Sequence, residues 1–175
     1  LVSSATRQLT SGASEILAEL SPDGEHPTAK HELLESTIEV ITGICTTVSE
    51  ATADLAGTIE ELRPLVAHRG LAMMCAGTHP TTDWATQTIS PDPRYAKLVE
   101  DMQWLARQLQ IFGVHVHVGV RSPEKVIPIV NALTAYVPHL LALVRRRPPS
   151  GRYRAVDVPI SDVAPGRPAA SRAGA

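Results

Sequence analysis

The chain has 175 residues, of which 43% are hydrophobic and 3% aromatic, and its formal net charge is −2. This length fits one domain with an aliphatic core, and the near-neutral charge argues against a nucleic-acid-binding protein, which would carry a basic patch. Two cysteines give no disulfide framework, no apolar run approaches the roughly 20 residues of a membrane span, and no signal peptide is visible, so we expect a cytoplasmic protein without a membrane partner.

The first half of the chain predicts two helices and two strands. Apolar residues at helical spacing predict a short helix over 6–20, and the β-rich end of 32–42 predicts a strand. A long helix is expected over 47–69, with an N-terminal Thr or Ser cap and Gly70 as its end. Pro64 lies inside this helix and predicts a kink.

The second half continues the alternation of strands and helices. A short buried strand is expected over 71–76, and a helix over 94–110 follows the turn Ser-Pro-Asp-Pro at 90–93. A valine-rich strand covers 113–121. Ser-Pro-Glu then begins a last helix that runs over 122–144 and contains two prolines.

The composition changes abruptly after residue 144. The segment 145–175 holds seven arginines, two acidic residues and five prolines, with little apolar periodicity. We therefore predict one domain over 1–144 and a disordered Arg/Pro-rich tail over 145–175. A linker to a lost domain and a shifted reading frame are alternative explanations of the tail.

The valine-rich strand carries the most unusual pattern in the chain. Four valines alternate with His115, His117, Gly119 and Arg121, so a strand would present one apolar face and one face with two imidazoles and a guanidinium. Imidazole binds metals or carries protons, and Arg recognises phosphate or carboxylate. Alone, the pattern leaves zinc binding, proton transfer and phosphate binding open. Because no cysteine or third histidine has a zinc-like spacing, a Mg²⁺ or Mn²⁺ nucleotide site is favoured.

Two acidic side chains lie on the predicted strand 32–42. In a straight strand Glu35 and Glu39 would share one face, roughly 13 Å apart along the strand. Each could bind a different ion of a metal cluster, and carboxylate oxygens suit Mg²⁺ or Mn²⁺. The alternative is an ordinary solvated strand face.

The loop Ala-Gly-Thr-His-Pro over 76–80 follows a predicted buried strand. Gly77, Thr78 and His79 offer donors for an anion, although a turn with a capping Thr would show the same pattern. No Gly-rich P-loop or Rossmann motif is present. Trp84 and Trp104 are expected to be packing residues.

Four segments together resemble the type 2 glutamate–cysteine ligase family, carboxylate–amine ligases distantly related to glutamine synthetase. These are HELLESTIEVIT, AGTHP, ISPDPRY and IFGVHVHVGV, and the likeness spans about 6–143. Alternating strands and helices alone would favour a doubly wound parallel sheet. The resemblance instead implies an α+β, glutamine synthetase-like fold, with a mostly antiparallel sheet and helices packed on one side.

The resemblance implies ATP-dependent joining of the γ-carboxylate of L-glutamate to the amine of L-cysteine, or of another amine, through a γ-glutamyl phosphate. It implies ATP and Mg²⁺ (or Mn²⁺) as cofactors and small molecules as substrates. The roles that follow by motif are metal binding by Glu35, Glu39 and His115, catalytic contacts by His115, His117 and Arg121, and nucleotide contacts by Gly77, Thr78, His79 and Gly119.

The sequence departs from the family at both ends. Family members begin with a G-x-E-x-E strand ahead of the first helix, and they continue with further strands where this chain has its Arg/Pro-rich segment. We therefore expect a truncated member with an incomplete sheet, whose unpaired edge favours homo-oligomers. The alternatives are a nucleotide- or metal-binding remnant without turnover and a metal-dependent hydrolase that uses the His-x-His strand.

Overall fold

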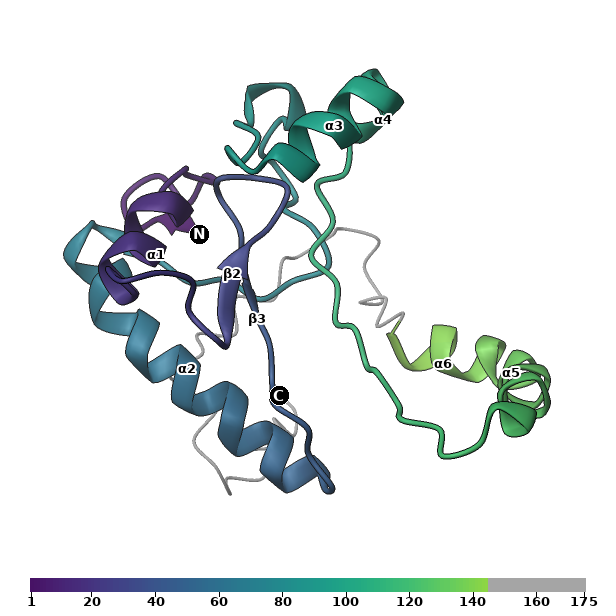
Figure 1. The fold of residues 1–175 in the computed structure, drawn as a ribbon. Helices are drawn as coiled ribbons and strands as arrows, with labels where there is room; N and C mark the ends of the chain where they lie inside the picture. The colour runs from purple at the N-terminus through teal and green to yellow at the C-terminus, as the bar shows by residue number, and fades with distance from the viewer. Residues whose placement is uncertain (145–175) are drawn as a thin grey trace, which may run out of the picture. The chain divides into compact units, whose positions relative to one another are not determined.

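A computed structural model describes residues 1–144, which divide into two units, 1–112 and 113–144. The first unit is α+β, with small antiparallel sheets and helices (Figure 1). Its helices are α1 (Ala13–Leu20), α2 (Val48–His68), α3 (Pro93–Met102) and α4 (Trp104–Arg107), and its strands are β1 (Val2–Ser3), β2 (Ala29–His31), β3 (Ile38–Val40) and β4 (Leu71–Ala72). The predicted tail over 145–175 lies outside the described residues.

Helix α2 confirms the prediction from its capping pattern. Thr47 is the N-cap, and its side chain accepts a hydrogen bond from the Glu50 amide at 3.1 Å. The Glu50 carboxylate in turn accepts from the Thr46 amide at 2.7 Å, which satisfies another amide at the helix start. Gly70 follows the helix with φ +67°, a conformation that favours glycine. The helix continues through Pro64 without ending there.

The predicted continuous strand over 32–42 is wrong. Strands β2 and β3 form an antiparallel hairpin in which Lys30 lies opposite Glu39, and residues 32–37 connect them. The physical reason is the pair Leu33 and Leu34, both of which are buried. A strand with one buried face can bury only alternate residues, so a connection is needed to bury two adjacent ones.

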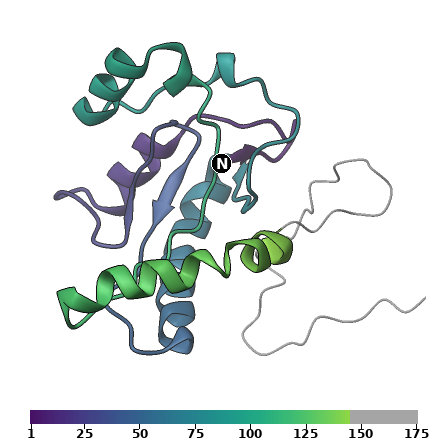
Figure 2. The ribbon, with the colours of Figure 1, turned by 90° about the vertical axis from the view of Figure 1, so that its right-hand side faces the viewer.

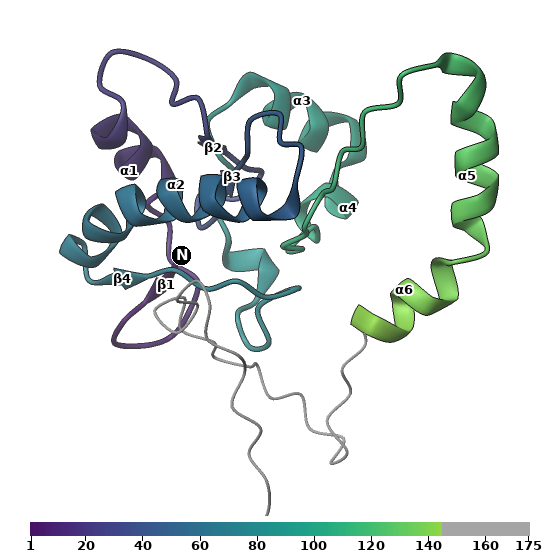
Figure 3. The same cartoon turned by 90° about the horizontal axis from the view of Figure 1, so that it is seen from below.

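Two apolar clusters organise the first unit. Helices α1 and α2 pack around the first cluster, in which Ile16 and Leu62 are almost fully buried, and β1 pairs with β4 at its edge (Figure 3). The second cluster contains Leu33, Leu34 and Tyr95. This second cluster joins the β2–β3 connection to α3, and it thereby positions the polar side chains described below.

Three predicted elements of the first unit are shorter than expected. The helix over 6–20 begins only at Ala13, because Val2 forms bridges to Ala72 and Leu9 that hold the preceding residues out of the helix. The strand over 71–76 pairs only at Leu71–Ala72. The helix over 94–110 is divided by Gln103, whose φ of +50° ends α3 and starts α4.

The second unit is an extended segment followed by helices (Figure 2). Within residues 1–144, no strand pairing involves 113–121, and the predicted valine strand with a buried apolar face is therefore wrong for the described chain. Val114, Val116 and Val118 remain 82%, 80% and 78% exposed, because a face is buried only when another layer covers it. The predicted last helix divides into η2 (Pro123–Lys125), α5 (Val126–Thr134) and α6 (Val137–Val144).

Candidate functional site

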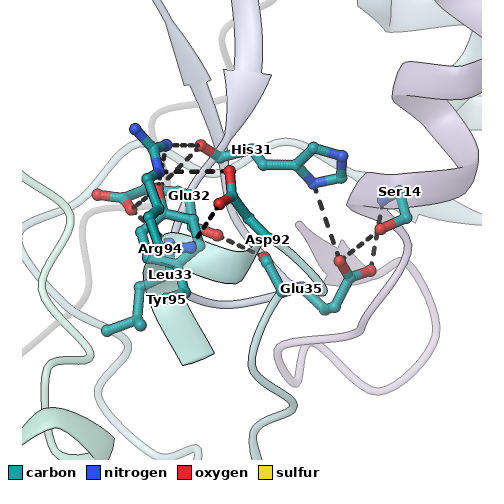
Figure 4. Close-up of polar contacts among 9 residues, drawn as sticks. Ser14, His31, Glu32, Leu33, Glu35, Asp92, Arg94 and Tyr95 are labelled. Carbon is teal, nitrogen blue, oxygen red and sulfur yellow. Dashed lines mark hydrogen bonds and ion pairs between the residues drawn. The ribbon is translucent and has the colours of Figure 1, made fainter. Parts of the chain in front are cut away.

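Glu35 caps the N-terminus of helix α1. Its carboxylate accepts hydrogen bonds from the Ser14 hydroxyl at 2.6 Å and the Ser14 amide at 3.3 Å (Figure 4). Its backbone carbonyl accepts from the amides of Gly12 and Ala13 at 3.0 Å each. Gly12, the N-cap residue, has no side chain that could accept hydrogen bonds from the first amides of the helix. A negative charge at this end of α1 is also favoured by the helix dipole. The sequence did not reveal this role, because the two partners belong to different elements.

His31 lies beside this cap, at the end of β2. Its Nδ1 atom is 3.9 Å from the Glu35 carboxylate, and the Glu35 side chain is only 12% exposed. At this distance the imidazole and the carboxylate form an ion pair if the imidazole is protonated, but they are too far apart for a hydrogen bond. Within the described residues the Nδ1 atom has no hydrogen-bond partner.

A second polar network joins the β2–β3 connection to helix α3. The Tyr95 hydroxyl lies 3.0 Å from the Glu32 carboxylate and 3.1 Å from the His31 carbonyl, and Arg94 donates to the hydroxyl at 2.6 Å (Figure 4). The Arg94 guanidinium also lies 4.4 Å from the centre of the Tyr95 ring. Burial, and then the charge of Glu32, raise the pKa of Tyr95 to about 12.

The predicted helix start at this point is confirmed. Asp92 is the N-cap of α3 and accepts a hydrogen bond from the Arg94 amide at 2.8 Å, and Pro93 is the first helical residue. Sequence reasoning did not find the contact between Tyr95 and Glu32, which lie far apart along the chain. The one indication in the sequence is a tyrosine directly after a helix start, since its hydroxyl needs a partner when the ring is buried.

Glu35 and Glu39 do not share a strand, in contrast to the prediction. Glu35 lies in the β2–β3 connection, whereas Glu39 lies in β3, half-buried. The Glu39 carboxylate has neither a hydrogen bond nor an ion pair within residues 1–144. Both side chains supply the oxygen donors that Mg²⁺ prefers, but no group of three His, Cys, Asp or Glu side chains among the described residues could hold a metal ion. The described residues therefore do not form a complete metal site, and metal binding by Glu35 and Glu39 stays a prediction.

Hydrogen bonds join the loop over 77–79 to residues 110–112, which directly precede the histidine segment. The Thr78 hydroxyl donates to the Gln110 carbonyl at 2.6 Å, and the Phe112 amide donates to the Gly77 carbonyl at 2.9 Å. The Thr78 hydroxyl thus bonds to a distant part of the chain and does not cap its own turn. Nucleotide binding by this loop stays a prediction. The backbone amides of Gly77 and Thr78 would be its donors, and they have no hydrogen-bond partner within residues 1–144.

His79 is buried, with 8% of its surface exposed. Its Nδ1 accepts from the Thr82 amide at 3.0 Å, so the proton of the neutral ring lies on Nε2, which donates to the Arg7 carbonyl at 2.9 Å. Both ring nitrogens are therefore used inside the first unit, and a ligand contact by His79 would require one of these bonds to break.

The second unit presents the predicted histidines side by side. The rings of His115 and His117 lie 6.4 Å apart at 88°, and both are exposed. Arg121 is exposed too, and a Cβ added at Gly119 would meet no atom within 4 Å. Imidazoles, an open backbone and a guanidinium thus follow one another along an extended segment. Their joint action with Glu35 and Glu39 stays a prediction.

The family model described as "Glutamate-cysteine ligase family 2(GCS2)" matches residues 1–145. The chain belongs to this family. The resemblance of the four sequence segments is thereby confirmed. Relatives include two proteins named "Putative glutamate--cysteine ligase 2-1", from Frankia alni, 58% identical over 151 residues, and from Mycolicibacterium vanbaalenii, 49% identical over 148 residues. The "Putative glutamate--cysteine ligase 2" from Thermobifida fusca is 54% identical over 134 residues.

The alignments cover most of this glutamate–cysteine ligase family 2 chain but less than half of its relatives. They include 85%, 85% and 77% of this chain, and 40%, 38% and 34% of the Frankia, Mycolicibacterium and Thermobifida proteins respectively. No solved structure matches the chain. Within residues 1–144, no helix has the length and apolar composition needed to span a bilayer.

Proposed function

We propose that the chain carries part of an ATP-dependent carboxylate–amine ligase of the glutamate–cysteine type, with a glutamine synthetase-like fold. The observation that carries this proposal is the family match over residues 1–145. The α+β architecture with antiparallel pairing agrees with it.

The proposed reaction has two steps. An oxygen of the glutamate γ-carboxylate attacks the γ-phosphorus of ATP, and ADP leaves. The amine of cysteine, or of another amino compound, then attacks the carbonyl carbon of the γ-glutamyl phosphate. Inorganic phosphate leaves with the bonding electron pair, and the amine loses a proton. Both steps place negative charge on phosphoryl oxygens, so positioned cations and N–H donors supply most of the stabilisation.

The second unit supplies donors of this kind. We propose that Arg121 holds an anionic phosphoryl or carboxylate group, and that the imidazoles of His115 and His117 contact the phosphate chain or the transferring group. The unobstructed space at Gly119 allows a phosphate to approach the backbone closely. Mg²⁺ would neutralise phosphate charge, with Glu39 and His115 as proposed ligands.

Glu35 has a different function in this proposal. Its carboxylate is already bonded to Ser14, so it supports the site by holding α1 against the β2–β3 connection. Direct metal binding by Glu35 would require that cap to open.

The test measures nucleotide binding and turnover on the same preparation. Calorimetric titration with ATP and Mg²⁺ should show binding that His115→Ala and His117→Ala both weaken. His68→Ala is a matched control, because His68 is an exposed histidine on α2. ADP release that requires both glutamate and an amine would support the ligase, and comparison of cysteine with other amines would identify the acceptor.

Two results would count against the proposal. ATP binding without ADP release by folded protein would favour a non-catalytic remnant. Unchanged ATP affinity in both histidine variants would remove the proposed role of the 113–121 segment.

A further inference from the structure

Both tryptophans of the chain line the same surface hollow. Trp84 begins the short 3₁₀ helix η1 (Trp84–Thr86) and is half-buried, whereas Trp104 begins α4 and is 65% exposed. The two indole rings meet edge to face, with centroids 6.4 Å apart and planes at 86°. The hollow has a volume of about 340 Å³, and Gln87, Ile89 and Arg107 also line it. This volume is at the lower end of the range for small-molecule sites.

The position of Trp104 at the hollow depends on an unusual backbone conformation. Gln103 joins α3 to α4 with φ +50° and ψ −125°, a combination that is costly for a residue with a Cβ atom. Trp104 and Arg107 follow three residues apart in α4, so they lie on the same face of this helix. The strained turn therefore directs an indole and a guanidinium into one hollow. Strain of this kind is concentrated at functional sites.

Arg107 supplies a positive charge to this hollow. Arg63, Arg69 and Arg94 each pair with a carboxylate. The Arg107 side chain, by contrast, has no hydrogen bond or ion pair within residues 1–144, and it is exposed. Arg107 and Ile89 also line a neighbouring hollow of about 400 Å³. Arg107 thus lines both the hollow that contains the two tryptophans and the neighbouring hollow.

We propose that the tryptophan hollow binds a planar aromatic ring that carries an anionic group, with a nucleoside monophosphate as the model ligand. The ring packs against the exposed indole of Trp104, since an indole face attracts planar rings. Arg107 binds the anion, because a guanidinium matches phosphate and carboxylate geometry. None of the residues predicted for the ligase reaction lines the hollow, so this binding does not rest on the proposed function.

Intrinsic fluorescence tests the proposal directly, because both fluorescent indoles lie at the site. Excitation at the red edge of the indole band avoids absorption by the ligand. The full chain is titrated with adenosine 5′-monophosphate in the presence of EDTA, so that metal-dependent nucleotide binding elsewhere does not contribute. Adenosine and ribose 5-phosphate, titrated separately, supply the ring alone and the anion alone.

We expect saturable quenching by the nucleotide, with tighter binding than for either fragment. Arg107→Gln should weaken nucleotide binding about tenfold and leave adenosine binding unchanged, because it removes only the charge-assisted hydrogen bonds. Trp104→Leu should weaken both ligands about tenfold, as expected for loss of one stacking surface. Arg63→Gln, which removes one positive charge on α2, is the matched control and should leave both affinities unchanged. Far-UV circular dichroism and thermal unfolding show that each variant is folded.

Three outcomes would overturn the proposal. The first is absence of saturable quenching in folded protein, and the second is equal loss of affinity in Arg63→Gln and Arg107→Gln. The third is fluorescence that changes with protein concentration and not with nucleotide, since the indoles would then be covered by a second copy of the chain.

Discussion

Replacement of Glu35 should destabilise the chain, because this residue caps a helix that supplies core residues. Glu35→Ala removes both side-chain bonds to Ser14 at the start of α1. Loss of an N-cap costs about 1 kcal/mol, hydrogen bonds to a charged group contribute about 1.5–3 kcal/mol, and a carboxylate at a helix N-terminus contributes about 0.3–1 kcal/mol. These contributions describe the same contact and overlap, so we expect a loss of about 2 kcal/mol. Glu35→Gln keeps an acceptor oxygen and should lose about 1 kcal/mol.

Urea unfolding followed by circular dichroism measures this effect. Ser14→Ala and the double variant complete a cycle, whose coupling energy should lie within about 0.5–3 kcal/mol, the range for residues in direct contact. Glu39→Gln is the control, since the Glu39 carboxylate has no partner within residues 1–144, and its free energy of unfolding should change by less than about 0.5 kcal/mol. If Glu35→Ala also stayed within about 0.5 kcal/mol of the parent, the capping role would be refuted.

Three further predictions concern contacts that stabilise the first unit. The absorbance difference between the parent and Tyr95→Phe should show a phenol that ionises near pH 12, because burial and then the charge of Glu32 raise its pKa from 10.0 to about 12. The stabilising contribution of the protonated phenol should therefore be present below pH 10.0 and lost as the pH rises to about 12. Ionisation near pH 10 would contradict both the burial of the hydroxyl and its contact with Glu32. Thr47→Ala should lower the free energy of unfolding by about 1 kcal/mol in urea unfolding, because it removes the acceptor for the Glu50 amide. Ser49→Ala is the control, since Ser49 is exposed in the first turn of α2 and its hydroxyl has no hydrogen bond within residues 1–144, and an equal loss in this variant would show that the effect is not specific to the cap. Leu62→Ala should cost about 2–5 kcal/mol in the same assay, since Leu62 is 1% exposed, and a cost below about 1 kcal/mol would mean that α2 is not packed as described.

The parts of the fold that the sequence predicted well depend on local interactions. Helix α2 is capped at Thr47 and ends before Gly70, because its caps and its apolar stripe lie within one continuous stretch of the chain. The sequence does not predict the connection between β2 and β3, because the β-rich residues after Ser36 and the leucines before them fit the pattern of one continuous strand. Burial of both Leu33 and Leu34 depends on α3, which follows only after α2 and β4 along the chain.

The candidate site shows the same limit at the level of side chains. The sequence identified His79 and Glu35 as groups capable of binding a ligand, but not the partners that already use them. These partners, Arg7 for His79 and Ser14 for Glu35, both lie in the N-terminal part of the chain, well before the residues that they contact. Residue type therefore indicates which ligands each group is able to bind, whereas its availability depends on tertiary contacts.

The segment over 113–121 shows most clearly the difference between what residue type predicts and what tertiary contacts determine. Strict alternation of valine with polar residues encodes two faces, but it does not specify a neighbouring strand or a covering layer. Burial of a valine side chain contributes about 1.5–3 kcal/mol, and Val114, Val116 and Val118 gain little of this in the described chain. The relatives contain more than half of their length outside the aligned part, so they hold further residues that could pair with such a segment. A pattern that predicts a strand inside a larger sheet is therefore compatible with an unpaired, exposed segment here.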